Sequence, residues 1–386
     1  MRILYSHRTR SADGQRVHID ALTRAFLKLG HEVLICGPEG ISTPDTPQRL
    51  SAGSDGPRGS HLPKPLYELA EWGYSLPASH RLRGAAKLFE PDIIYERYNL
   101  YYYAGEKVAK SLNLPLILEV NSPLADERAS NDGLALEGLA RRSERHIWQT
   151  ADAVLPVTGV LGEIIEAQGV PKERIHVVPN GVDEATLELS DGKDLRAAYE
   201  ITEPLVLGFV GFVRDWHGVD RAVDWLATET GKSCHLLLVG DGPAAPSLKA
   251  QAERLGVADR LTVTGVVQRN EVAAHIAAFD IALQPAVTAY ASPLKLQEYM
   301  AQARAVIAPD QPNIREVVTH GETAFLTPPG DTRAFHQALD LLAEDAALRE
   351  GLGRAARQVL LERDLTWAAN ARRVVAIAND LILARR

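Results

Sequence analysis

Short apolar runs alternate with segments of helical periodicity along most of the chain. These runs predict strands in the first half at residues 2–5, 33–36, 92–95, 116–120 and 153–157. They recur in the second half at residues 205–211, 236–240, 261–265, 280–285 and 305–308. Strands that are apolar on both sides and separated by helices are typical of parallel sheets covered by helices. The pattern therefore predicts an α/β fold with two parallel-sheet domains.

The stretch from Phe279 to Val318 has the most specific pattern of the chain. It predicts a strand, a helix with Ser292 at the N-cap and Pro293 at the first helical position, and a second strand. Leu294 begins the apolar stripe of this helix, whose N-terminus faces the carboxyl end of the sheet and can bind an anion. Lys295, at the third helical position, adds positive charge, and Glu298 can accept two hydrogen bonds from vicinal hydroxyls. We therefore expect a nucleotide diphosphate with its ribose at this place.

Glycines follow three predicted strands of the second half. Gly211, Gly240 and Gly265, the last beside Val266, would let the backbone approach a flat ligand closely. In the first half only Gly14 lies in the corresponding turn after the first strand. No G-x-G-x-x-G is present, so the sequence makes no direct case for NAD.

Polar residues in the first half lie where an acceptor could bind. Arg97 and Tyr98 follow the strand at 92–95 and would point into the crevice at the end of the sheet. His18 either faces this crevice or is a surface histidine. Residues 41–65 are rich in proline, serine and glycine, which predicts a loop that is either an acceptor lid or a surface insertion.

Composition limits the classes of function and partner. The chain has 386 residues and a net charge of −8, which disfavours nucleic acid as a partner. No apolar run is long enough to cross a bilayer, and Cys36 and Cys234, the two cysteines, suit a reducing cytoplasm. No Cys/His cluster has zinc-ligand spacing. A basic helix face could lie on anionic lipid as a peripheral membrane contact or could simply be solvated; its residues are Arg141, Arg142, Arg145 and His146.

The sequence SPLKLQEYMAQARAVIAPDQPNIREVV, beginning at Ser292, resembles a motif of the family-4 glycosyltransferases. These enzymes have the GT-B fold and carry two glutamates separated by seven residues at this place. The second glutamate matches Glu298, whereas the first falls on Tyr290. The substitution at Tyr290 removes a partner for the hydroxyls of the donor sugar. VPNGVD, which ends at Asp183, resembles the hinge sequence of the same family.

The resemblance implies roles for three further residues. Relatives supply an arginine and a lysine from the loop after the first strand of the second domain. Here that loop keeps Arg214, and His217 replaces the lysine. An imidazole with a pKa near 6.5 would make the contribution of His217 to diphosphate binding depend on pH. Asn121 occupies a position where many relatives have a histidine near the transferred sugar.

The resemblance also implies two Rossmann-like domains that face each other across a cleft. An acceptor-binding domain would span residues 1–183 and be completed by a C-terminal helix at about 365–386. A linker at 184–203 would lead to a donor-binding domain at 204–364. The implied activity is retaining transfer of a sugar from a nucleotide-diphosphate sugar to a saccharide or lipid-linked acceptor, in cell-envelope or exopolysaccharide biosynthesis. The leaving group would depart from the front face with the assistance of its own phosphate, and the resemblance implies neither a metal nor a cofactor.

Two alternatives remain open at this stage. A sugar-nucleotide epimerase shares this fold but needs carboxylates around the sugar, and Asn121 and Tyr290 weaken that interpretation. A nucleotide-sugar-binding protein without catalysis is compatible with the same two substitutions.

Overall fold

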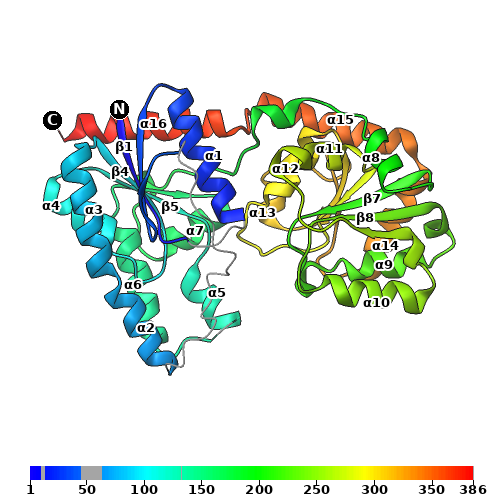
Figure 1. Ribbon diagram of the computed structural model, residues 1–386, viewed down its shortest axis with the longest axis horizontal. Coiled ribbons are helices and arrows are strands. Elements are labelled where there is room, and N and C mark those ends of the chain that lie inside the picture. The colour runs from blue at the N-terminus through cyan, green and yellow to red at the C-terminus, as the bar shows by residue number, and fades with distance from the viewer. Residues whose placement is uncertain (10–13, 45–62, 132, 386) are drawn as a thin grey trace. The chain divides into compact units, whose positions relative to one another are not determined.

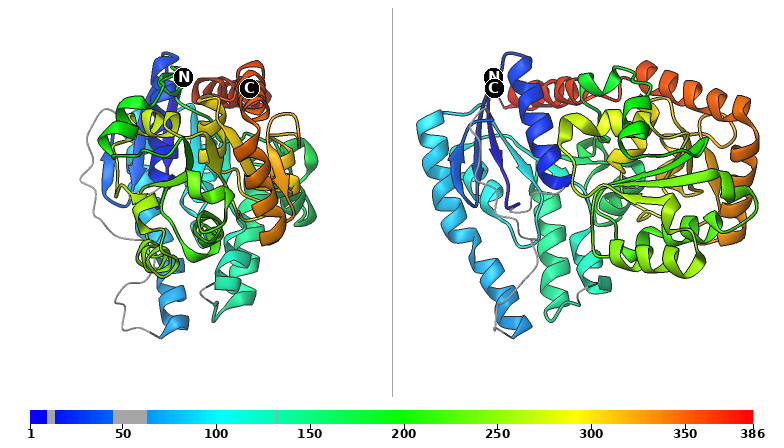
Figure 2. Two further views of the ribbon diagram at one scale, coloured as in Figure 1. Left: turned by 90° about the vertical axis from the view of Figure 1, so that its right-hand side faces the viewer. Right: turned by 45° about the vertical axis from the view of Figure 1, so that its right-hand side comes forward.

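The computed structural model describes residues 1–9, 14–44, 63–131 and 133–385, and most of the loop predicted at 41–65 lies outside this part of the chain. The described chain divides into two compact units (Figures 1 and 2). Unit 1 comprises Met1–Asn180, Tyr290–Ser292 and Trp367–Arg386, and unit 2 comprises Gly181–Ala289 and Pro293–Thr366. Each unit has its own sheet and its own buried core.

Unit 1 contains a six-stranded sheet in the order β3-β2-β1-β4-β5-β6. Neighbouring strands are parallel, except that the short β3 pairs antiparallel with β2. Residues of β4, β5 and β6 are buried throughout, as expected for strands with helices on both faces. The strands are β1 (Arg2–Ser6), β2 (Glu32–Gly37), β3 (Gly40–Ser42), β4 (Ile93–Arg97), β5 (Leu116–Val120) and β6 (Ala153–Pro156).

Helices from both ends of the chain cover the sheet of unit 1. The C-terminal helix α16 (Trp367–Ala384) packs on α1 (Gly14–Lys28) (Figure 1). The side chain of Asn370 on α16 donates to the Pro179 carbonyl at 2.6 Å, which ties the helix to the end of the first segment of the unit. The other helices are α2 (Lys64–Gly73), α3 (Ser75–Phe89), α4 (Ala104–Leu112), α5 (Leu124–Asn131), α6 (Glu137–Thr150), α7 (Gly159–Ala167) and a 3₁₀ turn at Lys172–Arg174.

Unit 2 contains a second six-stranded sheet, in the order β12-β11-β10-β7-β8-β9, and all its pairs are parallel. The strands are β7 (Leu205–Val210), β8 (Cys234–Val239), β9 (Leu261–Val263), β10 (Ile281–Leu283), β11 (Ala305–Pro309) and β12 (Phe325–Thr327). Its α-helices are α8 (Lys193–Ala198), α9 (Asp220–Leu226), α10 (Ala245–Leu255), α11 (Val272–Ala277), α12 (Leu294–Ala301), α13 (Pro312–Arg315), α14 (Thr332–Glu344) and α15 (Ala346–Glu362). Its 3₁₀ turns span Glu184–Leu187, Asp215–His217, Thr230–Ser233, Ala258–Arg260 and Arg269–Glu271.

The two sheets share one strand order and differ in direction only at the third strand, because β3 is antiparallel to β2 whereas β9 is parallel to β8. Numbered from the first strand of its own unit, each sheet has the strand order 3-2-1-4-5-6, which is the doubly wound order of dinucleotide-binding folds. The α/β class with two Rossmann-like sheets is therefore confirmed. In such sheets ligands bind beyond the carboxyl ends of the strands where the order reverses. That point lies between β7 and β10 in unit 2 and between β1 and β4 in unit 1.

Candidate functional site

The start of α12 lies next to the switch point of unit 2 and differs from the sequence prediction. Helix α12 begins at Leu294, so Pro293 is the N-cap residue and Lys295 is the second helical residue instead of the third. Ser292 is not the cap: its hydroxyl accepts the backbone N–H of Asn180 at 3.3 Å, and its carbonyl accepts the Asn180 side chain at 2.6 Å. No side chain caps the first turn of α12. The N-terminus of this helix therefore keeps N–H donors for an anion.

Lys295 lies close to the end of β7. Its Nζ is 3.8 Å from the centroid of the Phe209 ring and next to the backbone of Gly211. Burial lowers the pKa of the Lys295 ammonium to about 7, against a smaller opposing effect of Glu298. A desolvated ammonium that is half ionised near neutral pH gains its full charge when a diphosphate binds beside it.

The loop after β7 holds Arg214 and His217 in different environments. His217 is buried, stacks on Trp216 with ring centroids 3.9 Å apart, and accepts the backbone N–H of Arg214 through Nδ1 at 3.0 Å. Burial, followed by the charge of Lys295, lowers the pKa of His217 to about 3. The imidazole is therefore neutral at neutral pH, and the expectation that His217 supplies charge near pH 6.5 is wrong for the ligand-free protein. Arg214 is exposed, with its guanidinium 5.4 Å from the ring centroid of Phe212.

Two of the three strand-end glycines serve backbone packing. A Cβ on Gly240 would lie 2.3 Å from the carbonyl oxygen of Gly211, and both residues have positive φ. The backbones of the loops after β7 and β8 are thus in direct contact. Two hydrogen bonds of 2.9 Å join them: the Gly211 N–H donates to the Val239 carbonyl, and the Val213 N–H donates to the Asp241 carbonyl. Gly265 also has positive φ, but no atom lies within 4 Å of the Cβ that it lacks.

Glu298 is buried and already has a cationic partner, which the sequence analysis did not foresee. Arg269 forms an ion pair with Oε1 of Glu298 and lies 3.7 Å from a carboxylate oxygen of Asp183. Burial alone would lower the pKa of Arg269, but the charges and hydrogen bonds of Glu298 and Asp183 together outweigh burial and raise this pKa. Arg269 lies in a 3₁₀ turn 29 residues before Glu298, and no local pattern marks it. A carboxylate has about four lone-pair sites, so Glu298 keeps acceptor capacity for a ligand.

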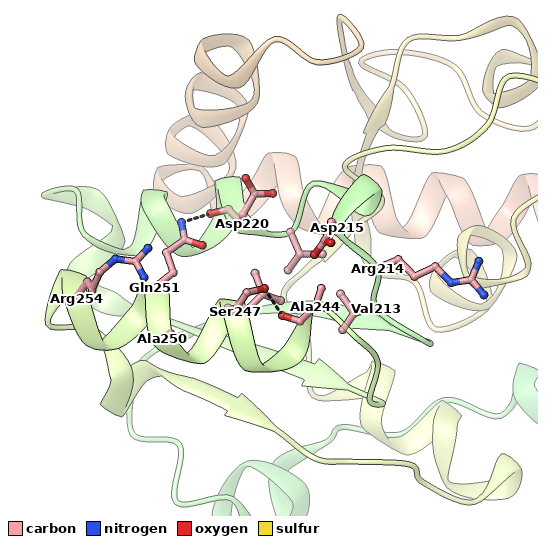
Figure 3. Close-up of a pocket in the computed structure, with 11 residues that line it drawn as sticks. Val213, Arg214, Asp215, Asp220, Ala244, Ser247, Ala250, Gln251 and Arg254 are labelled. Atoms are coloured by element: carbon pink, nitrogen blue, oxygen red, sulfur yellow. Dashed lines mark hydrogen bonds between the residues drawn. The ribbon is translucent and has the colours of Figure 1, made fainter. Parts of the chain in front are cut away.

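A hollow of unit 2 lies beside the loop after β7. It measures about 410 Å³ and is lined by the loop at 213–220 and by α10, including Asp215, Gln251 and Arg254. Arg214 is one of its lining residues, and Figure 3 shows the end of its side chain extending away from the other residues that line the hollow. Neither Lys295 nor Glu298 lines this hollow. The candidate site therefore centres on the switch point, and the hollow adjoins it at Arg214.

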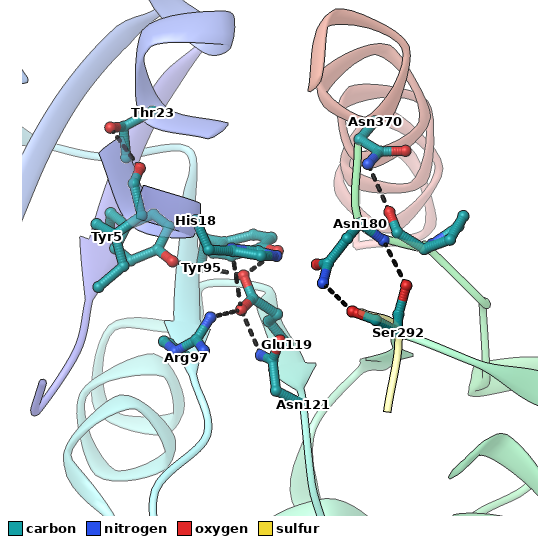
Figure 4. A network of polar contacts seen from close by, with 12 residues as sticks. Tyr5, His18, Thr23, Tyr95, Arg97, Glu119, Asn121, Asn180, Ser292 and Asn370 are labelled. Carbon is teal, nitrogen blue, oxygen red and sulfur yellow. Dashed lines mark hydrogen bonds and ion pairs between the residues drawn. The ribbon is translucent and has the colours of Figure 1, made fainter. Parts of the chain in front are cut away.

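In unit 1, a buried polar network centres on Glu119 of β5 (Figure 4). Glu119 forms an ion pair with Arg97 and accepts hydrogen bonds from Asn121 Nδ2 at 2.6 Å and from the Tyr95 hydroxyl at 2.9 Å. Burial alone would raise the pKa of Glu119, but His18, Arg97 and its hydrogen bonds lower it overall. The carboxylate is therefore ionised and fixes the side chains of Arg97 and Asn121 beside the carboxyl ends of β4 and β5.

His18 is not a surface residue. Its side chain is buried, lies edge-on to Trp367 with ring centroids 4.6 Å apart, and has Nδ1 3.4 Å from Glu119 without hydrogen-bond geometry. Burial, opposed by the charge of Glu119, lowers the pKa of His18 to about 4. A cavity of about 10 Å³ between His18, Glu119, Trp367 and Asn370 has room for about one water molecule.

The remaining predicted residues are scattered. The hydroxyl of Tyr98 donates to the buried carboxyl of Glu144 at 2.9 Å and its ring packs on Trp148, so Tyr98 belongs to the core and not to the network of Arg97. Gly14 is the first residue of α1. Val266 is 87% exposed next to Gly265. The structure thus groups Lys295, His217, Gly211 and Gly240 in unit 2, and Arg97, Asn121 and His18 in unit 1.

The described residues contain neither a cluster of metal-ligating side chains nor a membrane-spanning helix. No group of three or more His, Cys, Asp or Glu side chains among them could hold a metal ion. No helix in the same part of the chain has both the length and the apolar character needed to cross a bilayer.

Models of two protein families match most of the chain. The family described as Glycosyltransferase Family 4 matches residues 12–186, and the family described as Glycosyl transferases group 1 matches residues 204–345. A GDP-mannose-dependent alpha-mannosyltransferase of Mycobacterium tuberculosis is 26% identical over 87% of this chain and 85% of its own length. An alpha-D-kanosaminyltransferase of Streptomyces kanamyceticus is 25% identical over 63% of this chain. The match covers 65% of the length of that relative, just under two thirds.

Solved structures show the same fold. HepE of Anabaena, solved in complex with UDP, superposes with a TM-score of 0.76 and 17% identity, covering 98% of this chain and 100% of that chain.

Proposed function

We propose that this chain, which belongs to the family-4 glycosyltransferases and has their GT-B fold, transfers a sugar from a nucleotide-diphosphate donor to a saccharide or lipid-linked acceptor with retention of configuration. The observation that carries the proposal is the group at the switch point of unit 2. There the uncapped N-terminus of α12, the ammonium of Lys295 and the carboxylate of Glu298 lie on one short helix. The helix N-terminus can bind a diphosphate, and one turn further on the carboxylate of Glu298 can accept hydrogen bonds from the hydroxyls of its ribose.

The charges of the site suit departure of a diphosphate. Negative charge grows on the leaving group as the glycosidic bond breaks, and fixed donors and cations lower the energy of that transition state. Lys295 and the N–H groups of α12 supply such donors, and Arg214 on the loop after β7 adds a guanidinium that can bind phosphate through two parallel hydrogen bonds. These groups require no metal, so we propose that turnover persists in EDTA. Departure of the leaving group from the front face, with its own phosphate assisting, completes the proposed mechanism.

Similar proteins support the donor class. The relative from Mycobacterium tuberculosis is named as GDP-mannose-dependent, and HepE was solved with UDP. Both reported relatives carry transferase names, which favours transfer over epimerisation. We extend the proposal to cell-envelope or exopolysaccharide biosynthesis in the cytoplasm, where the buried free thiols of Cys36 and Cys234 would stay reduced.

The test combines binding with turnover. Calorimetry with UDP, GDP and their common sugar conjugates identifies the donor base and sugar. Release of nucleoside diphosphate is then measured with and without a lipid and oligosaccharide extract, and nuclear magnetic resonance of the product reports its anomeric configuration. Acceptor-dependent release with retained configuration is expected. Interconversion of nucleotide sugars without acceptor would favour an epimerase, and tight binding without turnover would favour a non-catalytic binding protein.

A further inference from the structure

Helix α2 buries its acidic residues and exposes its large apolar residues, the reverse of an ordinary surface helix. Its two acidic residues, Glu68 and Glu71, are 4% and 5% exposed. Leu66, Leu69 and Trp72 are 51%, 44% and 49% exposed. A surface helix of a globular protein normally presents its apolar stripe to the core and its charges to water.

Buried polar contacts fix this orientation. Glu71 accepts a hydrogen bond from Arg8 at 2.9 Å and two from Arg128 at 2.6 and 3.1 Å. Glu68 accepts the backbone N–H groups of Ala135 and Leu136 at 2.7 and 2.8 Å. Rotating α2 to bury its leucines would leave these charges unpaired, which is costly. The apolar side chains are therefore held outward by the fold.

The outward face continues along α3 without a break. Tyr74, between the two helices, has φ −60° and ψ −22°, so α2 and α3 form one nearly continuous helix along an edge of unit 1 (Figures 1 and 2). Exposed residues that recur every three or four positions, together with Leu88 beside the last of them, define what we call the α2–α3 face: Leu66, Leu69, Trp72, Leu76, His80, Arg83, Lys87 and Leu88. Its first half is apolar, and its second half is basic apart from Leu88.

The charge of this face has a single sign. Between residues 64 and 89 the only acidic residues are Glu68 and Glu71, and both are buried. The exposed ionisable side chains of this stretch are Lys64, His80, Arg83 and Lys87, although the whole chain has a net charge of −8. Within residues 64–89 an apolar patch thus lies beside cations and no exposed acid, and the exposed Glu90 that follows lies 3.8 Å from the guanidinium of Arg2. Such a patch is complementary to an anionic lipid surface.

We propose that the α2–α3 face lies on an anionic lipid bilayer. Leu66, Leu69, Trp72 and Leu76 would enter the boundary between headgroups and acyl chains, and Arg83 and Lys87 would contact lipid phosphates. A second copy of the chain is a poorer occupant, because the basic half of this face would meet only cations on the same face of its copy. The inference goes beyond sugar transfer, and lipid binding can be measured whether or not the chain transfers a sugar.

The basic face expected on α6 is less suited to this role. Arg141 pairs there with Asp126 and Glu137, and His146 lies 3.1 Å from a carboxylate oxygen of Glu106. These acids offset the positive charge that the sequence assigned to that face. The peripheral contact expected for the first half of the chain is therefore relocated to α2 and α3.

The experiment is co-sedimentation of the full chain with vesicles. Phosphatidylcholine vesicles containing one-third phosphatidylglycerol should bind the protein, and pure phosphatidylcholine should bind it at least tenfold more weakly. Leu69→Ser with Trp72→Ser should reduce binding at least tenfold, and so should Arg83→Glu with Lys87→Glu. Matched controls in unit 2 should leave binding unchanged: Leu341→Ser with Leu361→Ser on α14 and α15, which are 41% and 47% exposed, and Lys249→Glu with Arg254→Glu on α10.

Two further measurements test the proposal: the depth of Trp72 in the bilayer and the self-association of the chain in solution. Brominated acyl chains should quench part of the tryptophan fluorescence, and Trp72→Phe should lose that quenching while it still binds vesicles. Thermal unfolding checks that each variant folds. The proposal is overturned if the wild type does not bind anionic vesicles or if the control variants lose binding equally. It is also overturned if sedimentation velocity shows a dimer that Leu69→Ser with Trp72→Ser dissociates, because the face would then belong to a second copy.

Discussion

At the scale of single residues, the charge of the donor site depends on Lys295. With its pKa lowered to about 7 by burial, Lys295 is charged below that pH and neutral above it. A bound diphosphate favours the charged form, so donor affinity should fall by up to about tenfold per pH unit as the pH rises above 7. Calorimetry with an intact nucleotide sugar between pH 6 and 9 measures this, since its phosphate diester groups do not titrate in that range.

Two variants separate Lys295 from its neighbour. Lys295→Arg stays charged at every relevant pH and should bind the donor with a nearly flat pH profile. His217→Gln should keep the wild-type profile, because His217 is already neutral with a pKa of about 3. Equal slopes in the wild type and Lys295→Arg would show that Lys295 does not meet the diphosphate.

Glu298 gives a second prediction at this scale. If its carboxylate holds the ribose, Glu298→Gln should weaken nucleoside diphosphate binding by about 1.5–3 kcal/mol, the usual value of hydrogen bonds to a charged group. The penalty should vanish with a 2′,3′-dideoxynucleoside diphosphate, which has no vicinal hydroxyls. A penalty of the same size for both ligands would mean that the substitution only disturbs the ion pair with Arg269.

At the scale of elements, the sequence predicted the main strands because each is a short apolar run between helices. It missed β3 and β12, which are three residues long and lie at sheet edges, where one partner strand suffices and an apolar run is not required. It misplaced the start of α12 because serine is a common N-cap residue. In the structure Ser292 instead accepts hydrogen bonds from the backbone and side chain of Asn180. Arg269 and Glu119 could not be recognised from local patterns, since their partners come from distant parts of the chain.

The packed loops after β7 and β8 give a prediction about elements. Gly240→Ala places a Cβ 2.3 Å from the Gly211 carbonyl at a φ of +132°, so it should destabilise unit 2 by roughly 2–5 kcal/mol and displace the loop that carries Arg214. Gly265→Ala is the matched control, with φ +73° and open space, and should cost about 1 kcal/mol. Denaturant unfolding with donor binding distinguishes the pair. Equal costs would mean that left-handed backbone strain, and not loop packing, sets both values.

At the scale of the whole molecule, the chain folds as two units whose segments are not consecutive in sequence. Unit 1 needs the last 20 residues of the chain, Trp367–Arg386, although unit 2 lies before them in sequence. The tie consists of particular contacts: Trp367 against His18, Asn370 with the Pro179 carbonyl, and Arg385 with both carboxylate oxygens of Asp152 at 2.7 Å. Unit 1 therefore cannot complete its core until the end of the chain is present.

This dependence makes the stability of the two units separable. Trp367 is 3% exposed, so Trp367→Ala should lower the unfolding free energy of unit 1 by about 3–5 kcal/mol through the cavity that it leaves. Unit 2 should be unaffected, because Trp367 belongs to unit 1. Leu360→Ala on α15 is the matched control: it is fully buried in the core of unit 2 and should weaken only that unit, by about 2–5 kcal/mol. Hydrogen exchange of amides in β5 and in β8 reports the two units separately. Loss of protection in both strands for either variant would mean that the units unfold together and that α16 is not an independent tie.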